Sequence, residues 1–195
     1  DQLLAILLSD VIKEGDEVIF DVKCSQALED VISELGGRPV MWKTGHSLIK
    51  NKMAENNCKI GGEMSGHIFF ADDYFGYDDA IYVAGRLIQM LSNTEKTLSE
   101  LKSVIPKYIS TPEIRLEAES DEKKFEIAKM AEDYFSKNYD CITVDGVRVK
   151  FKEGWGLVRA SNTQPVIVCR FEGDTIDNMN KIQSIILDKL KEFGN

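Results

Sequence analysis

The feature that most constrains the fold is an alternation of helical and strand-like apolar patterns over the first 105 residues. Apolar side chains recur at helical spacing in residues 4–12, and a short β-rich run follows at residues 18–22. The alternation continues with a helical pattern at residues 26–35 and a second strand at residues 39–42. Strands separated by helices of this length favour parallel pairing, so residues 1–105 predict a layered α/β domain, a mixed sheet with helices.

The rest of this domain contains one more helix, a pair of strands and a capped helix. Residues 47–56 form a helical pattern, and residues 59–62 and 67–70 are typical of two strands that meet at a turn. Asp78 or Asp79 is placed to cap the next helix. The predicted apolar stripe of that helix consists of Ala80, Ala84, Leu87, Ile88 and Leu91.

The pattern changes between Pro106 and Pro112, and we interpret residues 106–112 as a linker. Asp145 and Gly146 are the strongest hairpin signal in the part that follows. Strands are expected at residues 113–118, 142–144, 147–151, 155–159 and 166–171, and helices at residues 121–139 and 176–193. Helices over one face of a mainly antiparallel sheet predict a smaller α+β domain at residues 113–195.

Composition narrows the classes of function. The chain has 195 residues and a formal net charge of −9, and binding to a nucleic-acid backbone depends on clustered Lys and Arg, so we expect no nucleic-acid partner. The longest apolar run, residues 3–8, is too short to cross a membrane, and no signal peptide is visible. Four cysteines without C-x-x-C pairing favour a reduced, cytoplasmic protein. Because Asp1 leads straight into a helical pattern, we expect a piece of a longer chain.

The string Gly-Glu-Met-Ser-Gly-His at residues 62–67 has the groups that bind sugar hydroxyls. Glu63 offers a carboxylate, Ser65 a small hydroxyl and His67 an imidazole. If the backbone is extended, these three side chains project on one face, and the flanking glycines let a ligand approach closely. A glycine-rich turn with solvated polar residues is the alternative interpretation.

A second string, Arg-Ala-Ser-Asn-Thr at residues 159–163, suits a phosphate dianion. It combines the guanidinium of Arg159 with two hydroxyls and an amide, and Arg170 lies in the strand that follows the loop. The phosphate-binding set is therefore predicted to be Arg159, Ser161, Asn162, Thr163 and Arg170. A turn whose Ser, Asn and Thr bond to their own backbone explains the composition equally well.

Two further positions are candidates by their place in the fold. His46 lies in Lys-Thr-Gly-His-Ser at residues 43–47, which follows a strand and opens a helix, where anions are favoured. Lys23 ends a buried-looking strand, which is where open α/β sheets place ligand groups. A plain helix cap and a surface lysine are the respective alternatives. The acidic residues Asp72, Asp73, Asp78 and Asp79 are interpreted as loop and capping residues and not as a metal site.

Together, residues 43–47, 62–67 and 159–163 resemble the C-terminal half of an α-D-phosphohexomutase, and the resemblance covers essentially the whole chain. Met64 favours the phosphomannomutase/phosphoglucomutase subgroup, since the similar phosphoglucosamine mutases usually carry Gln there. Enzymes of this family have four domains. The resemblance implies that this chain is the third and fourth, an α/β domain followed by a TATA-binding-protein-like α+β domain.

The resemblance also implies roles for the motif residues. Glu63 and Ser65 would bind sugar hydroxyls so that either end of the hexose can be presented. His67 would stand near the transferring phosphoryl group, and Lys23 and His46 would line the same cleft as further catalytic residues. Residues 159–163 would hold the phosphate that is not reacting.

The family reaction interconverts hexose 1-phosphate and hexose 6-phosphate of mannose or glucose through a phosphoserine and a bisphosphate intermediate, with Mg²⁺ neutralising charge. The serine loop and the Asp-Gly-Asp metal loop of the family do not occur in this sequence. We therefore expect the complete protein to be an intramolecular phosphotransferase, an isomerase whose N-terminal domains bind Mg²⁺. This chain alone is expected to bind no metal and to be inactive.

Three alternatives remain open. The chain resembles a phosphoglucosamine mutase nearly as well, and a non-catalytic module that binds sugar phosphates would carry the same two motifs. A generic α/β scaffold whose polar strings are only turns is the third. The sequence leaves open which hexose is preferred, the oligomeric state, the angle between the domains and whether the chain binds substrate unaided.

Overall fold

The structure is a computed structural model, and it describes residues 1–194. The chain divides into two compact units. Unit 1 comprises Asp1–Lys107 and unit 2 begins at Tyr108.

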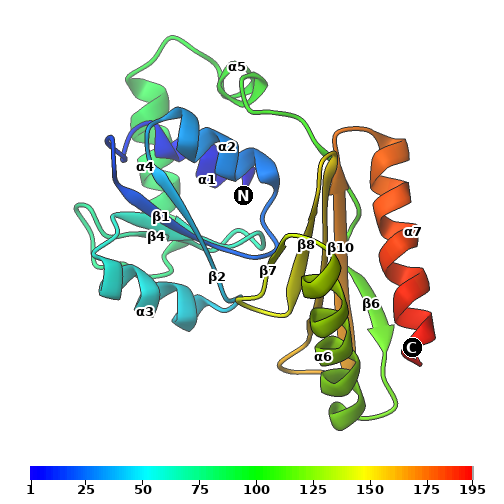
Figure 1. Cartoon of the computed structure of the whole chain (residues 1–195). Helices are drawn as coiled ribbons and strands as arrows, with labels where there is room; N and C mark the ends of the chain where they lie inside the picture. The colour runs from blue at the N-terminus through cyan, green and yellow to red at the C-terminus, as the bar shows by residue number, and fades with distance from the viewer. Residues whose placement is uncertain (195) are drawn as a thin grey trace. The chain divides into compact units, whose positions relative to one another are not determined.

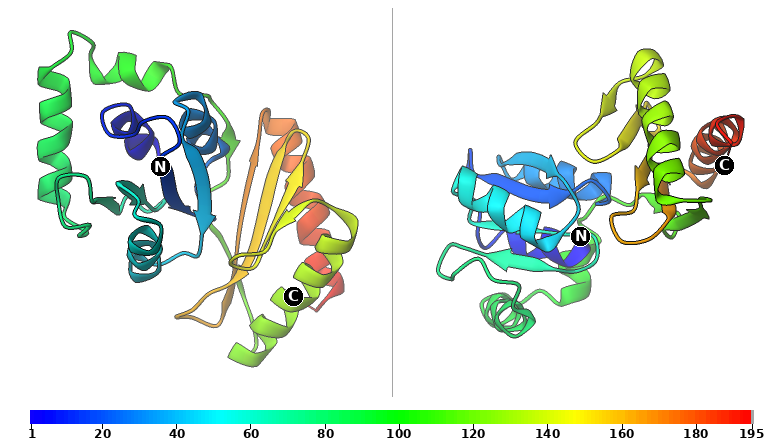
Figure 2. Two further views of the ribbon diagram at one scale, coloured as in Figure 1. Left: turned by 60° about the vertical axis from the view of Figure 1, so that its left-hand side comes forward. Right: turned by 90° about the horizontal axis from the view of Figure 1, so that it is seen from below.

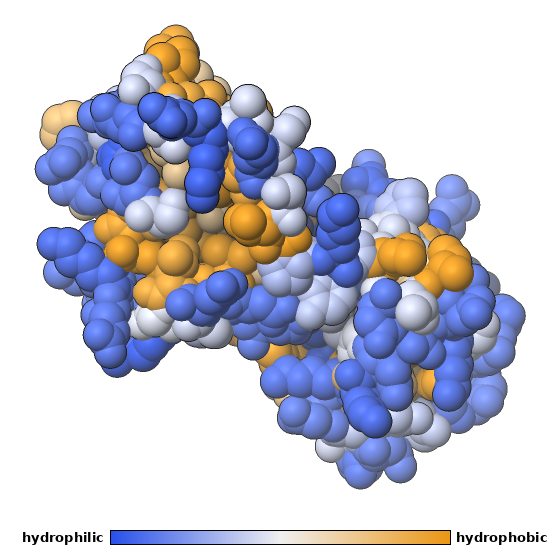
Figure 3. All heavy atoms as spheres, turned by 90° about the horizontal axis from the view of Figure 1, so that it is seen from above, coloured by the Kyte–Doolittle hydropathy of each residue, from blue (hydrophilic) through white to orange (hydrophobic). Residues whose placement is uncertain are grey.

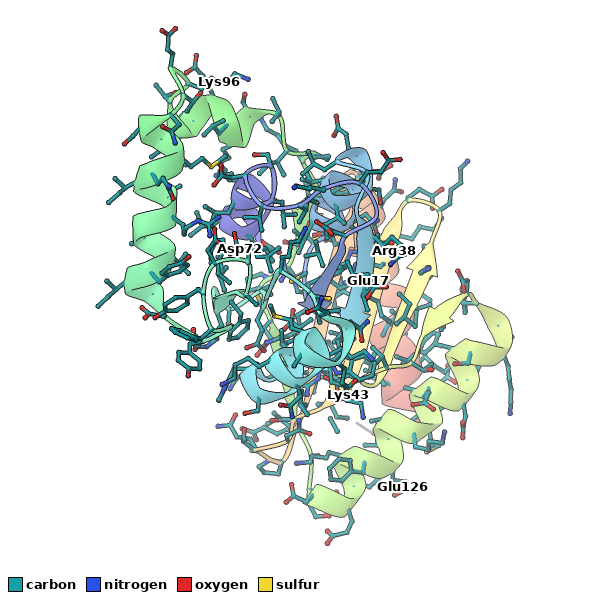
Figure 4. The ribbon with its side chains drawn as sticks, turned by 90° about the vertical axis from the view of Figure 1, so that its left-hand side faces the viewer. Glu17, Arg38, Lys43, Asp72, Lys96 and Glu126 are labelled. Atoms are coloured by element: carbon teal, nitrogen blue, oxygen red, sulfur yellow. The ribbon has the colours of Figure 1, made fainter. Side chains whose placement is uncertain are left out.

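Unit 1 is built on a four-stranded sheet with the order β2-β1-β3-β4. The central strand β1 (Glu17–Asp21) pairs in parallel with β2 (Arg38–Trp42) and with β3 (Ile60–Gly62). β3 pairs antiparallel with β4 (Ile68–Phe70), so the predicted mixed sheet is confirmed. Figure 4 shows Glu17 and Arg38 side by side at the start of β1 and β2, where their side chains form an ion pair at 3.2 Å.

Helices cover both faces of this sheet (Figure 1). α1 (Gln2–Leu8) and α2 (Gln26–Glu34) pack together on one face, and α3 (His46–Asn56) packs on the other. α4 (Ala80–Ser92) contacts β4 and α1, and α5 (Leu98–Ser103) contacts α1. The result is a three-layer α/β/α unit, as the alternation of patterns predicts.

The core on the α3 side follows from the alternation of side chains along β1. Ile19 is fully buried there with Ile49 and Met53 of α3, while its neighbours in the strand point to the opposite face. Gly61 allows this close packing. A Cβ at that position would lie 2.7 Å from the carbonyl oxygen of Ile19 and from the Sδ atom of Met53.

Three details of unit 1 differ from the sequence-based expectation. The first helix ends at Leu8 and not at Ile12, since turns follow it, although Val11 is still buried. The buried residue of α4 is Val83; in the predicted stripe Ala80 and Ala84 are exposed and Ile88 is 65% exposed. The short helix α5 was not predicted, although the Thr97 and Glu100 capping box at its start is a recognisable signal.

Unit 2 contains an antiparallel sheet with the order β5-β10-β9-β8-β7, and β6 also pairs with β10. The long strands are β8 (Val147–Phe151), β9 (Gly154–Ala160) and β10 (Val166–Gly173). The shorter strands are β5 (Ile109–Ser110), β6 (Ile114–Glu117) and β7 (Cys141–Ile142). β5 falls within the predicted linker at residues 106–112, so part of that segment belongs to the sheet.

Both helices of unit 2 lie on one face of this sheet (Figure 2). α6 (Asp121–Asn138) and α7 (Ile176–Glu192) cover a core that includes Phe135, Val158 and Ile186, all fully buried. This arrangement confirms the predicted α+β class. Ile176 of α7 is half-exposed, because it is the first residue of the helix.

Candidate sugar-phosphate site

The candidate residues of unit 1 lie at the carboxyl edge of its sheet. β1, β2 and β3 run parallel, so the segments that follow them emerge at the same edge. Lys23 follows β1, His46 lies just beyond β2, and the string at residues 62–67 follows β3. The parallel topology therefore brings together three strings that are far apart in the sequence.

Asp21, the last residue of β1, ties these three segments together. Its carboxylate is fully buried, and one oxygen accepts hydrogen bonds from the backbone N–H of Met64 and from the Cys24 thiol, each at 3.2 Å. The other oxygen accepts from the Thr44 hydroxyl at 3.4 Å and lies 3.9 Å from the Nζ atom of Lys23. The Lys23 side chain is 12% exposed, so this candidate is no ordinary surface lysine.

Glu63 is buried and is held by the segment before α3. Its Oε1 atom accepts a hydrogen bond from the backbone N–H of Gly45 at 2.8 Å. Gly45 has φ 135°, a backbone conformation that favours glycine. The bond fixes the carboxylate of Glu63 next to His46, the first residue of α3.

The backbone of residues 63–67 is a turn and not an extended strand. Glu63 donates its N–H to the carbonyl of His67 at 2.9 Å, and Gly66, with φ 101°, donates to the carbonyl of Glu63. The expectation that Glu63, Ser65 and His67 alternate on one face is therefore wrong. Glu63 is buried and bonded to Gly45, whereas Ser65 is exposed at the tip of the turn.

His67 lies at the exit of this turn and is oriented by Asp78. Its Nδ1 atom is 2.6 Å from Oδ2 of Asp78, and an ionised carboxylate can only accept, so Nδ1 donates. In the neutral imidazole the Nε2 atom is then the proton acceptor. The ring of His46 lies 6.3 Å from the ring of His67, so the two histidines of the chain are neighbours.

In unit 2 the candidate arginines share the face of the sheet that is turned away from α6 and α7. Register places Arg148, Leu157 and Arg170 in one row, and Arg115, Val168 and Arg159 in another. Arg159 is 6% exposed, and its Nε atom donates to Oδ2 of Asp145 at 3.0 Å. The Arg170 guanidinium donates to the Ser110 hydroxyl at 3.2 Å. This face therefore gathers four arginine side chains, together with the buried carboxylate of Glu172.

The loop that carries Ser161, Asn162 and Thr163 joins β9 to β10 and is held at both ends. Ser161 donates its N–H to the carbonyl of Val166 at 2.9 Å, and its hydroxyl accepts from the N–H of Thr163 at 3.3 Å. The latter bond is the local turn that the alternative interpretation predicts.

The other end of this loop is anchored from α6. The Nζ atom of Lys124, which is 2% exposed, donates to the carbonyl of Gln164 at 2.8 Å and pairs with Asp121 at 2.6 Å. Arg115 donates to the side chain of the same glutamine. The loop is therefore anchored by groups that sequence reasoning did not single out.

The residues that sequence reasoning missed are Asp21, Gly45, Asp78, Lys124 and Asp145. A charged residue at the end of an apolar strand is a signal that marks Asp21 in the sequence. Asp78 was interpreted only as a loop or capping residue. Its neighbour Asp79 is the cap of α4, and the N–H of Tyr82 and the Tyr74 hydroxyl lower the pKa of Asp79 by donating to its carboxylate.

Two general observations bear on the classes of ligand. Within residues 1–194, no group of three or more His, Cys, Asp and Glu side chains is arranged to hold a metal ion. Asp72 pairs with Arg86 at 2.8 Å, Asp78 with His67, and Asp79 with the start of α4. None of the helices in this described part is long and apolar enough to span a bilayer.

A three-layer α/β unit with polar loops at one sheet edge, followed by an α+β unit, matches a pair of domains of the phosphohexomutase class. Sequence models of this class match almost the whole chain. The α/β/α domain III of phosphoglucomutase/phosphomannomutase matches residues 1–108, and the C-terminal domain matches residues 113–189. The chain therefore belongs to the phosphoglucomutase/phosphomannomutase family.

Individual relatives agree with this assignment. The chain is 47% identical over 193 residues to phosphomannomutase/phosphoglucomutase of Pseudomonas aeruginosa, covering 98% of the chain and 42% of the relative. It is 40% identical to phosphoglucomutase of Neisseria gonorrhoeae, covering 94% of the chain and 41% of the relative. The chain thus spans about two-fifths of the length of these relatives.

A solved structure shows the same fold. The phosphoglucomutase/phosphomannomutase family protein of Burkholderia thailandensis superposes with a TM-score of 0.84 at 36% identity. The match covers 97% of this chain and 41% of that structure. Family membership and fold class are confirmed, whereas the roles of the individual site residues stay predictions.

Proposed function

We propose that this chain is the substrate-recognition half of a phosphohexomutase that interconverts the 1-phosphates and 6-phosphates of mannose and glucose. The domain organisation that we propose is a sugar-binding domain at residues 1–105, a linker at residues 106–112 and a phosphate-binding domain at residues 113–195. The observation that carries the proposal is the convergence of Lys23, His46, Glu63 and His67 at one sheet edge in a member of this family. A reduced, cytoplasmic protein remains part of the proposal, supported by four free thiols.

In unit 1 the proposed roles follow from the geometry. Glu63 accepts hydrogen bonds from sugar hydroxyls while Gly45 holds its carboxylate in place. Ser65, exposed at the tip of the turn, adds a hydroxyl that donates and accepts. His67, with Nδ1 donating to Asp78, presents Nε2 to take or return a proton on the sugar oxygen that exchanges the phosphoryl group. Lys23 supplies positive charge beside His67, and His46 supplies a second imidazole there.

In unit 2 we propose that the phosphate which does not react is held by Arg159, Arg170, Ser161, Asn162 and Thr163. The ion pair of Arg159 with Asp145 at 3.0 Å uses its Nε atom, and its Nη groups would make the bidentate contact to the phosphate. Arg170 on the same sheet face adds a second guanidinium.

Transfer of the phosphoryl group needs a nucleophile and neutralisation of charge. Among residues 1–194, no group of three or more His, Cys, Asp and Glu side chains is placed to hold Mg²⁺. We therefore propose that the phosphoserine and the Mg²⁺ site lie in domains outside this chain, which is consistent with its span of 42% of a relative. The chain's own residues bind and orient the sugar phosphate.

The relatives favour this proposal over the alternatives. The proteins that are 40–47% identical are named as phosphomannomutase/phosphoglucomutase or phosphoglucomutase. Structures named as N-acetylphosphoglucosamine mutase are only 14% identical and show the fold alone.

Kinetics of the complete protein test the proposal. With glucose 1-phosphate as substrate, Glu63→Gln should lower kcat/KM about tenfold to a hundredfold, since it loses a charged acceptor while Gln can still accept from Gly45. Arg159→Lys should raise KM about tenfold, because the single ammonium of lysine cannot bind both Asp145 and the phosphate as a forked guanidinium does.

The exposed residues Glu55 and Arg38 provide matched controls as Glu55→Gln and Arg38→Lys. Unchanged kinetics in both site variants would contradict the assigned roles.

A further inference from the structure

One helix of unit 1 is apolar on the side that faces away from the unit. α4 has the sequence AIYVAGRLIQMLS, and Arg86 is its one charged residue. Arg86 points inward, where its guanidinium pairs with Asp72 at 2.8 Å and with Asp10 at 3.6 Å. Figure 4 shows Asp72 on the inner side of α4. The outward side is therefore left without charge.

The outward side consists of Ile81, Ala84, Gly85 and Ile88, and we call it the α4 outer face. These positions are i, i+3, i+4 and i+7 of one helical stripe. Ile81 is 87% exposed and Ile88 is 65% exposed, and a Cβ added at Gly85 would meet nothing within 4 Å. Two isoleucines flank a centre of small residues, which lets another helix approach closely.

The apolar surface continues beyond the start of the helix. Phe75 is 75% exposed and Tyr77 is 58% exposed, and their rings stack with centroids 5.5 Å apart. Tyr74 joins this pair to α4, because its ring lies 6.1 Å from Tyr77 and stacks at 3.8 Å on Tyr82. Unit 1 exposes apolar side chains elsewhere as well, since Figure 3 shows a patch of them on the face seen from above, in the part drawn at the left. The α4 outer face and the aromatic side chains of Phe75 and Tyr77 together form an exposed apolar surface, which is typical of an interaction site, so we expect the α4 outer face to be covered.

We propose that the domains which precede this chain in the complete protein cover the α4 outer face. The matched models are domain III and the C-terminal domain of the family, and the chain spans 42% of a relative, so a large part of the polypeptide lies before domain III. That polypeptide continues into α1, which packs against α4. A covalently attached domain has a high effective concentration at a neighbouring surface, so even a modest apolar contact is populated. The inference rests on the proposed function only in that both require these preceding domains.

The occupant that fits this face is an apolar helix or strand surface. Ile81 and Ile88 are β-branched and stand about two turns apart, or roughly 10 Å along the axis, which matches the spacing of ridges on a packed helix. The adjacent aromatic pair, Phe75 and Tyr77, adds area at one end of this stripe.

Labelling of an introduced cysteine tests this inference. Ile88→Cys is placed in the complete protein and in the chain of 195 residues, and its reaction with a maleimide is followed by mass spectrometry at that site. In the shorter chain the thiol should react at the rate of an exposed cysteine. In the complete protein it should react about tenfold or more slowly, because labelling then needs a local opening. Ile176→Cys, at a half-exposed isoleucine that begins α7, is the matched control.

A charge substitution provides the second measurement. Ile88→Glu should lower the melting temperature of the complete protein by several degrees and leave that of the shorter chain within about one degree, since the glutamate is solvated only in the shorter chain.

Equal labelling rates and equal melting shifts in both proteins would overturn the inference. Slow labelling already in the shorter chain would overturn the inference too. A rate that falls as the protein concentration rises would then indicate that a second copy covers the α4 outer face. A rate that is independent of protein concentration would indicate that unit 2 covers it. Mutase activity of the unsubstituted complete protein tests the proposed function separately.

Discussion

The carboxylate of Asp21 accepts the backbone N–H of Met64 at 3.2 Å, which joins the end of β1 to the turn that carries Glu63. The same buried carboxylate accepts the Thr44 hydroxyl at 3.4 Å. A single side chain thus fixes the relative positions of the segments that follow all three parallel strands. We interpret Asp21 as a positioning residue, because it acts through these segments and is itself fully buried.

Removal of this carboxylate should loosen the site and destabilise unit 1. Asp21→Ala leaves the N–H of Met64 without its acceptor, and a buried unsatisfied donor costs about 1–3 kcal/mol of unfolding free energy. Hydrogen exchange of the amides in residues 62–67 should accelerate correspondingly. Asp21→Asn retains a carbonyl oxygen and should lose less. The exposed residue Asp73 provides the control as Asp73→Ala, and equal protection in all three variants would contradict the role of Asp21.

Much of unit 1 is predictable because its signals are local. The strand β1 is an apolar run bounded by polar residues, and the helices that alternate with the strands imply parallel pairing. The turn at residues 63–67 is not predictable from alternation, since i, i+2 and i+4 spacing occurs in a strand and in a turn alike. Gly66, which adopts φ 101°, was the local sign of the turn.

Long-range polar pairs are the part of the site that sequence reasoning could not supply. Glu63 and Gly45 are 18 residues apart and meet only because β2 and β3 flank β1 in parallel. Lys124 and Gln164 are 40 residues apart and meet across unit 2.

The stripe of α4 was misjudged for a different reason. The apolar side chains of α4 do recur at helical spacing. Arg86, its one charged residue, is however turned inward to Asp72 and Asp10, so the apolar side of the helix is not its buried side.

The pair of His67 and Asp78 predicts a specific tautomer. In this chain the neutral imidazole of His67 should carry its proton on Nδ1, because that atom donates to Asp78 at 2.6 Å. Long-range ¹H–¹⁵N correlation spectra of the histidine rings report the protonated nitrogen directly. Asp78→Ala should shift the population toward the Nε2-protonated form, while Asp73→Ala should leave it unchanged. Finding the Nε2-protonated form in the unsubstituted chain would exclude the proposed use of Nε2 as acceptor.

Lys124 should control the order of the loop in unit 2. Lys124→Met keeps the buried methylene packing but removes the donor to the carbonyl of Gln164, which costs about 1–3 kcal/mol of unfolding free energy. Amide exchange in residues 161–164 should accelerate, and the affinity for inorganic phosphate should fall. Lys129→Met, on the same helix with a side chain that is 63% exposed, is the control. If both variants behave alike, Lys124 does not anchor the loop.

The thiols should differ in reactivity according to burial. Burial raises the pKa of Cys58 to about 11 and that of Cys169 to about 12, and it also raises the pKa of Cys141, which is only half-buried. Because the thiolate is the nucleophile, iodoacetamide at pH 8 should modify Cys141 before the other two.

The pH dependence of alkylation provides the sharper measurement. Below its pKa a thiol gains thiolate about tenfold per pH unit, so the rate at Cys58 should still rise between pH 9 and pH 10. In urea the same thiol should level off near its ordinary pKa of 9.0, because unfolding removes the burial that raises it. The comparison uses one residue in two states, so differences in reagent access cancel from the shape of the profile. A native profile for Cys58 that levels off at pH 9 would show that this thiol is solvated, and the packing of Cys58 against Ile49 and Met53 would then be wrong.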